Sequence, residues 1–167
     1  MIRPCRASDS AAIEMIINEA AQVYRGAIPA DCWHEPYMSA DELRAETAAG
    51  LEFWVYEEES TLIAVMGLQN VDDATLIRHA YVTPAHQRRG RGGALLDFLI
   101  QRATKQLLVG TWAAATWAIR FYERHGFRLV PPEEKDRLLL RYWTITTRQR
   151  ETSVVLRHFG QQAGSAQ

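Results

Sequence analysis

A turn rich in glycine and arginine, residues 87–94, is the part of the chain best suited by composition to bind a ligand. It follows residues 74–82, whose β-branched and aliphatic side chains are typical of a strand, and Pro84 ends that strand because it has no N–H to donate. A helical pattern of leucines follows at residues 94–106. The first N–H groups of a helix are unpaired and lie at the positive end of its dipole. A phosphate or pyrophosphate is therefore the expected ligand, with positive charge supplied by Arg88, Arg89 and Arg91.

The turn does not match two common phosphate-binding motifs. A P-loop requires Lys-Ser or Lys-Thr after its glycines, and the dinucleotide motif G-x-G-x-x-G from Gly90 would require glycine where Leu95 stands. The arginine and glycine run is also similar to segments that bind single-stranded nucleic acid, but those are usually repetitive and disordered. The formal net charge of -1 gives no basic excess for a polyanion. We therefore expect no nucleic-acid partner.

Two motifs identify the chain as similar to a known superfamily. Gln87-x-x-Gly90-x-Gly92 matches the [QR]-x-x-G-x-[GA] signature of the GNAT superfamily of acyl-CoA-dependent N-acetyltransferases. Residues 118–127 resemble the A-x-x-F-Y-x-x-x-G-F segment of the same superfamily. The resemblance implies an α+β, layered GNAT fold. Its mixed, strongly twisted central sheet is splayed in the middle, with helices on both faces and acyl-CoA in the split.

Length and composition predict one globular domain, because the 167 residues are 47% hydrophobic and 23% charged. We expect this domain to span residues 1–159, followed by a small, polar, flexible tail at 160–167. Cys5 and Cys32 have no C-x-x-C spacing, so neither a disulfide framework nor a zinc site is predicted. No apolar run approaches the roughly 18 residues of a membrane span, and a signal-peptide core is lacking. The expected location is cytoplasmic, without a membrane partner or a metal.

Apolar periodicity predicts the element order β-α-α-β-β-β-α-β-α-β-β, which is similar to the GNAT fold. The expected helices are residues 10–25, a helix opened by a capping box at Ser39 and ended at Gly50, residues 94–106, and residues 117–125 capped by Thr116. The expected strands are residues 2–6, 51–57, 61–70, 74–82, 107–111, 127–130 and 153–157, and residues 137–142 are also strand-like, in addition to that order. The polar segment 142–152 is longer than a hairpin turn, and no role is predicted for it.

The resemblance implies which residues bind acyl-CoA. In the superfamily the glycine turn donates backbone N–H groups to the pyrophosphate, and the preceding strand pairs with the pantetheine arm. A bulge in that strand opens the sheet, and an N–H there polarises the thioester carbonyl. The implied residues are Ala80, Tyr81, Val82, Gln87, Arg88, Arg89, Gly90, Arg91, Gly92, Gly93 and Ala94. Relatives often have asparagine where this chain has Ala115, and Thr116 is expected to replace that pantetheine contact.

Amide formation requires a neutral amine and a proton for the leaving thiolate. The resemblance implies Tyr122 as the acid, since an unperturbed phenol with a pKa of about 10 is protonated at neutral pH. Simple packing beside Phe121 is the alternative. His79 is the expected base because histidine accepts protons near neutral pH, but alternation does not predict its face across a bulge, so a packing role stays open. Glu35 and a water molecule are further candidates for the base.

The loop at residues 28–38 combines aromatic and polar side chains, as acceptor pockets often do. The expected acceptor-binding residues are Trp33, Glu35, Tyr37 and Arg78. The five tryptophans, Trp54, Trp112 and Trp117 among them, indicate either an aromatic-walled cleft or a homodimer face. The predicted reaction is direct transfer of an acetyl group from acetyl-CoA to a primary amine of a small molecule. Two alternatives stay open: acetylation of a protein or peptide amine, and a silent acyl-CoA-binding sensor.

Overall fold

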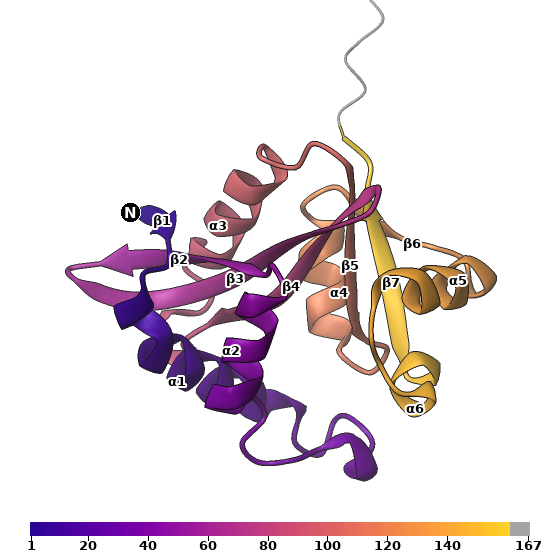
Figure 1. The fold of residues 1–167 in the computed structure, drawn as a ribbon, viewed down its shortest axis with the longest axis horizontal. Helices are drawn as coiled ribbons and strands as arrows, with labels where there is room; N and C mark the ends of the chain where they lie inside the picture. Colours follow the sequence, from indigo (N-terminus) through magenta and orange to yellow (C-terminus); the bar gives the residue numbers. More distant parts are fainter. Residues whose placement is uncertain (161–167) are drawn as a thin grey trace, which may run out of the picture.

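A mixed sheet of seven strands in the order β1-β2-β3-β4-β5-β7-β6 forms the centre of the computed structural model, which describes residues 1–160 (Figure 1). The strands are β1 (Ile2–Pro4), β2 (Glu52–Glu58), β3 (Thr61–Val71), β4 (Ala74–Val82), β5 (Gln106–Trp112), β6 (Phe127–Leu129) and β7 (Ser153–His158). β4 and β5 are parallel, and the other neighbouring pairs are antiparallel. The predicted fold class is confirmed. The predicted tail, apart from Gly160, lies outside the described residues.

Helices cover both faces of the sheet (Figure 1). They are α1 (Ser10–Ala20), α2 (Ala40–Ala48), α3 (Arg91–Ile100), α4 (Thr116–Glu123), α5 (Pro132–Tyr142) and α6 (Thr147–Glu151). Side chains of α3 and α4 pack with Met66 and Ile77 on one face, here called the α3 face. Side chains of α1, α2 and α5 pack on the opposite, α2 face, where Val65 and Leu76 lie. Successive residues of a strand point to opposite faces, which explains this partition.

A β-bulge interrupts β4 at His79. His79 and Ala80 together lie opposite the single residue Met66 of β3. The φ angle of His79 is 53°, in the left-handed region that residues other than glycine seldom adopt. β4 and β5 remain paired only as far as Ile77 and Val109, so the two strands separate immediately before the bulge. Because a bulge bends its strand, the predicted opening of the sheet occurs at this point.

Several predicted helix boundaries hold and others need correction. Ser39 and Glu42 form the predicted capping box, and Gly50 follows α2 with a φ angle of 99°. α1 ends at Ala20, where a short 3-10 segment, Ala21–Tyr24, replaces the last expected turn. The helix expected at 94–106 is α3, which begins at Arg91 and ends at Ile100. The glycine turn therefore contributes the first residues of this helix.

Two sequence predictions in the last third of the chain were wrong. Residues 137–142 are not a strand but the end of α5, which begins with proline and two glutamates in its first turn. The buried residues of α5 are Leu138, Leu139 and Tyr142, a helical spacing. Thr116 does not cap α4: the N-cap is the buried Ala115, whose methyl side chain cannot accept a hydrogen bond.

The segment 142–152, for which no role was predicted, contains α6. Thr146 caps this short helix, because its hydroxyl accepts a hydrogen bond from the Gln149 N–H at 3.1 Å. Within residues 1–160, none of the helices is both long and apolar enough to cross a bilayer.

Candidate active site

A cleft of about 1040 Å³ lies where β4 and β5 separate, and residues from both faces of the sheet line it. The lining contains most of the predicted site residues: Tyr37, Arg78, His79, Ala80, Tyr81, Val82, Gln87, Arg88, Gly90, Arg91, Gly92, Gly93, Ala94 and Tyr122. Four predicted residues lie outside the lining that the described chain forms: Trp33, Glu35, Arg89 and Thr116. The structure therefore gathers most of the glycine turn, the predicted acid Tyr122 and the predicted base His79 around one cavity.

The glycine turn presents unpaired backbone donors at the start of α3. Gly90 is the N-cap of α3 and has a φ angle of 76°, a conformation that glycine adopts without strain. The N–H of Ala94 is the first to donate inside the helix, to the Gly90 carbonyl at 2.9 Å. Within residues 1–160, the N–H groups of residues 88–93 donate to no protein acceptor. Such donors at a helix N-terminus fit a pyrophosphate.

Gly92 and Gly93 have a second role, in packing, that the sequence argument missed. A Cβ atom on Gly92 would lie 3.0 Å from Cγ2 of Val82, at the end of β4. A Cβ atom on Gly93 would lie 2.9 Å from Cε1 of His125, just after α4. The two glycines therefore allow α3 to approach both β4 and the end of α4, beside the cleft that these residues line.

The charged side chains of the turn are not equivalent. Nε of Arg91 donates to the Glu58 carboxylate at 2.7 Å, and its Nη1 donates to the Arg89 carbonyl at 2.8 Å. Gln87 donates to the carbonyl of Val82 at 3.1 Å. Arg88 lines the cleft and forms no ion pair within residues 1–160. Arg88 is consequently the arginine of this turn that is best placed to meet an anionic ligand.

Tyr122 lies on α4 with its ring buried and only 6% of the residue exposed. The ring contacts Phe121 and Phe127 edge-on, with centroids 5.2 and 5.5 Å away. Its hydroxyl has no hydrogen-bond partner within the described residues. In that part of the chain, Nε1 of Trp54 is the only fully buried polar side-chain atom that lacks a partner. The Tyr122 hydroxyl is therefore not fully buried, and Tyr122 is among the residues that line the cleft. Burial, and then the nearby Tyr24 phenol, raise the pKa of Tyr122, which keeps the hydroxyl protonated.

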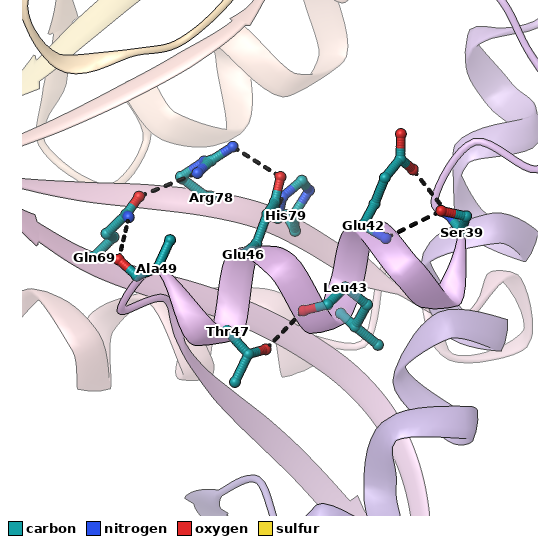
Figure 2. Close-up of polar contacts among 9 residues, drawn as sticks. All are labelled: Ser39, Glu42, Leu43, Glu46, Thr47, Ala49, Gln69, Arg78 and His79. Carbon is teal, nitrogen blue, oxygen red and sulfur yellow. Dashed lines mark hydrogen bonds and ion pairs between the residues drawn. The ribbon is translucent and has the colours of Figure 1, made fainter.

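His79 and Arg78 both point to the α2 face, toward Glu46 of α2 (Figure 2). Nε2 of His79 lies 2.5 Å from Oε2 of Glu46, and Nη2 of Arg78 donates to Oε1 of the same carboxylate at 3.1 Å. The His79 ring also stacks near Phe53, with centroids 6.1 Å apart. The bulge explains how two consecutive residues share a face. The orientation of His79, which the sequence left open, is thereby established.

The sequence argument missed Glu46. Its only signal was its position three residues after Leu43, the one buried side chain of α2, which places both on the sheet-facing side. Burial alone would raise the pKa of Glu46, but the hydrogen bond and charge of His79, together with Arg78, outweigh it and lower the pKa below its usual 4.5. Glu46 is therefore an ionised carboxylate beside two basic side chains.

We predict that Glu46 makes the stability of the fold depend on pH. Because its pKa is lowered in the folded state, the ionised group stabilises the fold above about pH 4.5, by on the order of 1 kcal/mol. This contribution is lost as the pH falls through the folded-state pKa. Urea denaturation should find wild type more stable than Glu46→Gln at pH 7, with the difference shrinking below pH 4. A difference that is constant from pH 7 to pH 3 would contradict the assignment.

Aromatic side chains line the cleft on the side of the 28–38 loop. The Tyr37 hydroxyl accepts a hydrogen bond from Nε1 of Trp112 at 3.0 Å. The Tyr24 ring lies 5.6 Å from Tyr37 and 6.0 Å from Trp117, measured between centroids. Trp143, from the segment between α5 and α6, also lines the cleft and was missed by the sequence argument.

Three other residues, which the sequence analysis considered for the cleft or the acceptor site, lie outside the described lining of the cleft. Trp54 packs against Phe98 on the α3 face, outside the cleft lining of the described chain. Trp33 stacks on Tyr37, with centroids 5.7 Å apart, and so packs against a residue that lines the cleft without being part of the described lining. Glu35 is exposed and lies 3.5 Å from Arg25 in an ion pair, which gives no support to its candidacy as a base.

Comparison with known proteins gives the family. The model of the acetyltransferase (GNAT) domain matches residues 49–129, which include the bulge and the glycine turn. The peptidyl-lysine N-acetyltransferase YiaC of Escherichia coli strain K12 is 27% identical over 121 residues, covering 68% of this chain and 80% of YiaC. The chain belongs to the GNAT superfamily. It is an N-acetyltransferase of that superfamily, so the predicted enzyme class is confirmed.

Solved GNAT structures share the architecture. The ribosomal-protein-S18-alanine N-acetyltransferase of Escherichia coli superposes with a TM-score of 0.67 at 22% identity, covering 95% of this chain and 92% of that one. The PaiA N-acetyltransferase of Thermoplasma acidophilum, solved with coenzyme A, has a TM-score of 0.69 at 15% identity, covering 95% and 97%. At these identities the likeness concerns the fold.

GNAT acetyltransferases use acetyl-CoA, and features of this chain fit that co-substrate. The unpaired N–H groups at the start of α3 suit its pyrophosphate, and the free edge of β4 beyond Ile77 suits an extended arm. Thr116 is exposed and outside the lining of the described chain, which gives no support to its expected contact. Within residues 1–160, no group of three or more His, Cys, Asp or Glu side chains is arranged to hold a metal ion.

We predict that Arg88→Ala weakens coenzyme A binding about five-fold, whereas Arg89→Ala leaves it unchanged. The two residues are adjacent and exposed, but only Arg88 lines the cleft, so the pair is a matched comparison. A factor of five corresponds to ~1 kcal/mol, typical of one charged contact near the surface. Isothermal titration with coenzyme A at low salt measures both. Equal effects of the two substitutions would show that the arginines act only through general charge.

Proposed function

We propose that this GNAT enzyme transfers the acetyl group of acetyl-CoA directly to a primary amine of a small molecule. The observation that carries the proposal is a pair of links that tie the 28–38 loop to segments far from it in sequence, beside the cleft. Nε of Arg148, in α6, donates to Asp31 of the 28–38 loop at 3.0 Å, and Trp112 of β5 donates to Tyr37 of the same loop at 3.0 Å. A pocket bordered by segments that are tied together in this way suits a small acceptor better than an extended polypeptide.

In the proposed chemistry, Tyr122 donates a hydrogen bond and His79 accepts a proton. Bound acetyl-CoA supplies a thioester that an amine can attack. Tyr122 holds a proton on an accessible hydroxyl, which can hydrogen-bond to the sulfur as negative charge develops there. Its raised pKa makes complete transfer to a thiolate uphill, so we assign its main effect to this hydrogen bond. His79, which lines the same cleft, is the proposed acceptor of the amine proton.

A protein or peptide amine is the second candidate, and the comparisons favour it. YiaC is named for peptidyl-lysine and the Escherichia coli structural neighbour for the alanine of ribosomal protein S18. Neither name fixes the acceptor of this chain, because their identities to it are 27% and 22%. The two candidates differ in size at the entrance to the cleft. A protein or peptide would have to fit its chain past the 28–38 loop and α6, which are linked, whereas a small molecule would not.

Thiol release from acetyl-CoA tests the proposal when each amine is offered both free and within a peptide. The panel contains aryl-alkyl amines, polyamines and amino acids beside peptides with a lysine or an N-terminal alanine, and mass spectrometry identifies the amide. We expect at least one free amine to exceed every peptide ten-fold or more in kcat/KM. Faster reaction of a peptide would replace the small molecule by the second candidate. No thiol release with either class would contradict both.

A further inference from the structure

One acidic residue, Glu46 of α2, is not used by the proposed chemistry, although it contacts the proposed base directly. We infer that Glu46 is a positioning residue: its carboxylate accepts the Nε2–H of His79 and so leaves the lone pair of Nδ1 free to take the amine proton. This inference rests on the proposed function for its chemical purpose. The geometry on which it stands is independent of the acceptor (Figure 2).

The tautomer follows from the carboxylate contact. A neutral imidazole carries hydrogen on one nitrogen and a lone pair on the other. Nε2 of His79 is 2.5 Å from Oε2 of Glu46, and an ionised carboxylate can only accept, so Nε2 carries the hydrogen. Nδ1 then has the lone pair. The same arrangement orients histidines in many proton-transfer sites.

Nδ1 of His79 is unpaired and not fully buried within residues 1–160. Within residues 1–160 it has no hydrogen-bond partner, since the contact of His79 with Glu46 uses Nε2. In that part of the chain, Nε1 of Trp54 is the only fully buried polar side-chain atom that lacks a partner. Nδ1 of His79 also lacks a partner, so it is not fully buried. His79 is among the residues that line the cleft. The nitrogen that the carboxylate leaves free is therefore the one that solvent or an acceptor can reach.

Other side chains hold Glu46 in place. Its second oxygen, Oε1, accepts from Nη2 of Arg78 at 3.1 Å, and Nη1 of Arg78 donates to Gln69 at 3.1 Å. Both carboxylate oxygens are thus engaged, one by each neighbour on β4. The charged groups facing the imidazole are Glu46 from α2 and Arg78 from β4, while Phe53 and Gln69 are uncharged.

The proton step balances within this cluster. The acceptor arrives as an ammonium ion, its N–H bond breaks, and an Nδ1–H bond forms on His79. The lone pair stays on the amine nitrogen for attack on the thioester. The imidazolium that results lies against the Glu46 carboxylate in a charge-assisted hydrogen bond. It later returns its proton to water, which restores the starting state.

The test separates positioning from a simple link between α2 and β4. Glu46→Gln keeps the size of the side chain but removes its charge and permits either imidazole tautomer. Asp41→Asn, an exposed carboxylate-to-amide change in the same helix, is the matched control. Nitrogen-15 NMR of the imidazoles at pH 8 reports the tautomer without any acceptor. We expect an Nε2–H form at His79 in wild type and Asp41→Asn, and a mixture of tautomers in Glu46→Gln.

Kinetics complete the test on the folded variants. We expect Glu46→Gln to lower kcat about ten-fold with KM for acetyl-CoA unchanged, and to cause no further loss when His79 is already glutamine. An Nδ1–H tautomer in wild type, or additive losses in the double variant, would overturn the inference. The expected tautomers without turnover on any amine would instead contradict the proposed function and leave the positioning of His79 standing. The two failures are therefore distinguishable.

Discussion

Tyr122→Phe is expected to reduce kcat about 100-fold while leaving the affinity for acetyl-CoA unchanged. The substitution removes one hydroxyl, and the loss of a donor aimed at developing negative charge typically costs 10² to 10³ in rate. The ring keeps its contacts with Phe121 and Phe127, so the cleft keeps its shape. Single-turnover release of thiol, with saturating acceptor, measures the chemical step directly.

The same variant should fold at least as stably as wild type. The Tyr122 hydroxyl has no hydrogen-bond partner within residues 1–160, so its removal breaks no bond that supports the fold. Tyr56→Phe is the matched control, since Tyr56 packs on the α3 face outside the cleft lining of the described chain. A Tyr122→Phe enzyme with undiminished kcat would refute the assignment of Tyr122 as the hydrogen-bond donor to the thioester sulfur.

Gly67→Ala is expected to destabilise the fold by about 1–3 kcal/mol and to reduce activity through the bulge. Gly67 pairs with Arg78 just before the bulge of β4. A Cβ atom at this position would lie 2.9 Å from the Arg78 carbonyl oxygen and 2.9 Å from Cδ1 of Leu51. The leucine can shift, but the carbonyl belongs to the backbone that sets the positions of Arg78 and His79. Urea denaturation and kcat report the two consequences.

Gly160→Ala provides the comparison for that experiment, because a Cβ atom there would meet no atom of residues 1–160 within 4 Å. Its stability should equal that of wild type within experimental error. Full stability and activity in Gly67→Ala would indicate that the sheet absorbs the methyl group without moving the bulge. In that case the close packing of β3 against β4 does not fix the site geometry.

The fold was predictable where local signals and the family motifs agreed. Three features depend on short, local stretches of sequence: the Ser39 capping box, the meander of three strands and the turn at Gly90. The failure at α5 shows how a local signal was misread. The sequence Leu138-Leu139-Leu140 is apolar enough for a strand, but Leu140 is 65% exposed, and Leu139 and Tyr142 form a helical pair. Pro132 at the start of the helix was the decisive local sign.

The grouping of the glycine-turn residues at the cleft was largely predictable, and the contacts of His79 were not. The motif at residues 87–94 places eight neighbouring residues at one turn, and seven of them line the cleft. The face of His79 depends on one extra residue in β4, which alternation cannot predict. Glu46 lies 33 residues away in sequence from His79, so only the packing of α2 on the sheet reveals their contact. The link from Arg148 to Asp31 is equally nonlocal, at a separation of 117 residues.

The central claim is that the acetyl group is transferred directly within the cleft between β4 and β5. The most direct test is to measure initial rates over a grid of acetyl-CoA and acceptor concentrations. Direct transfer requires both substrates to be bound together, so double-reciprocal plots should intersect, and no acetylated protein should accumulate when the acceptor is omitted. Parallel lines, together with an acetyl group on the enzyme detected by mass spectrometry, would contradict the account and indicate a covalent acetyl-enzyme.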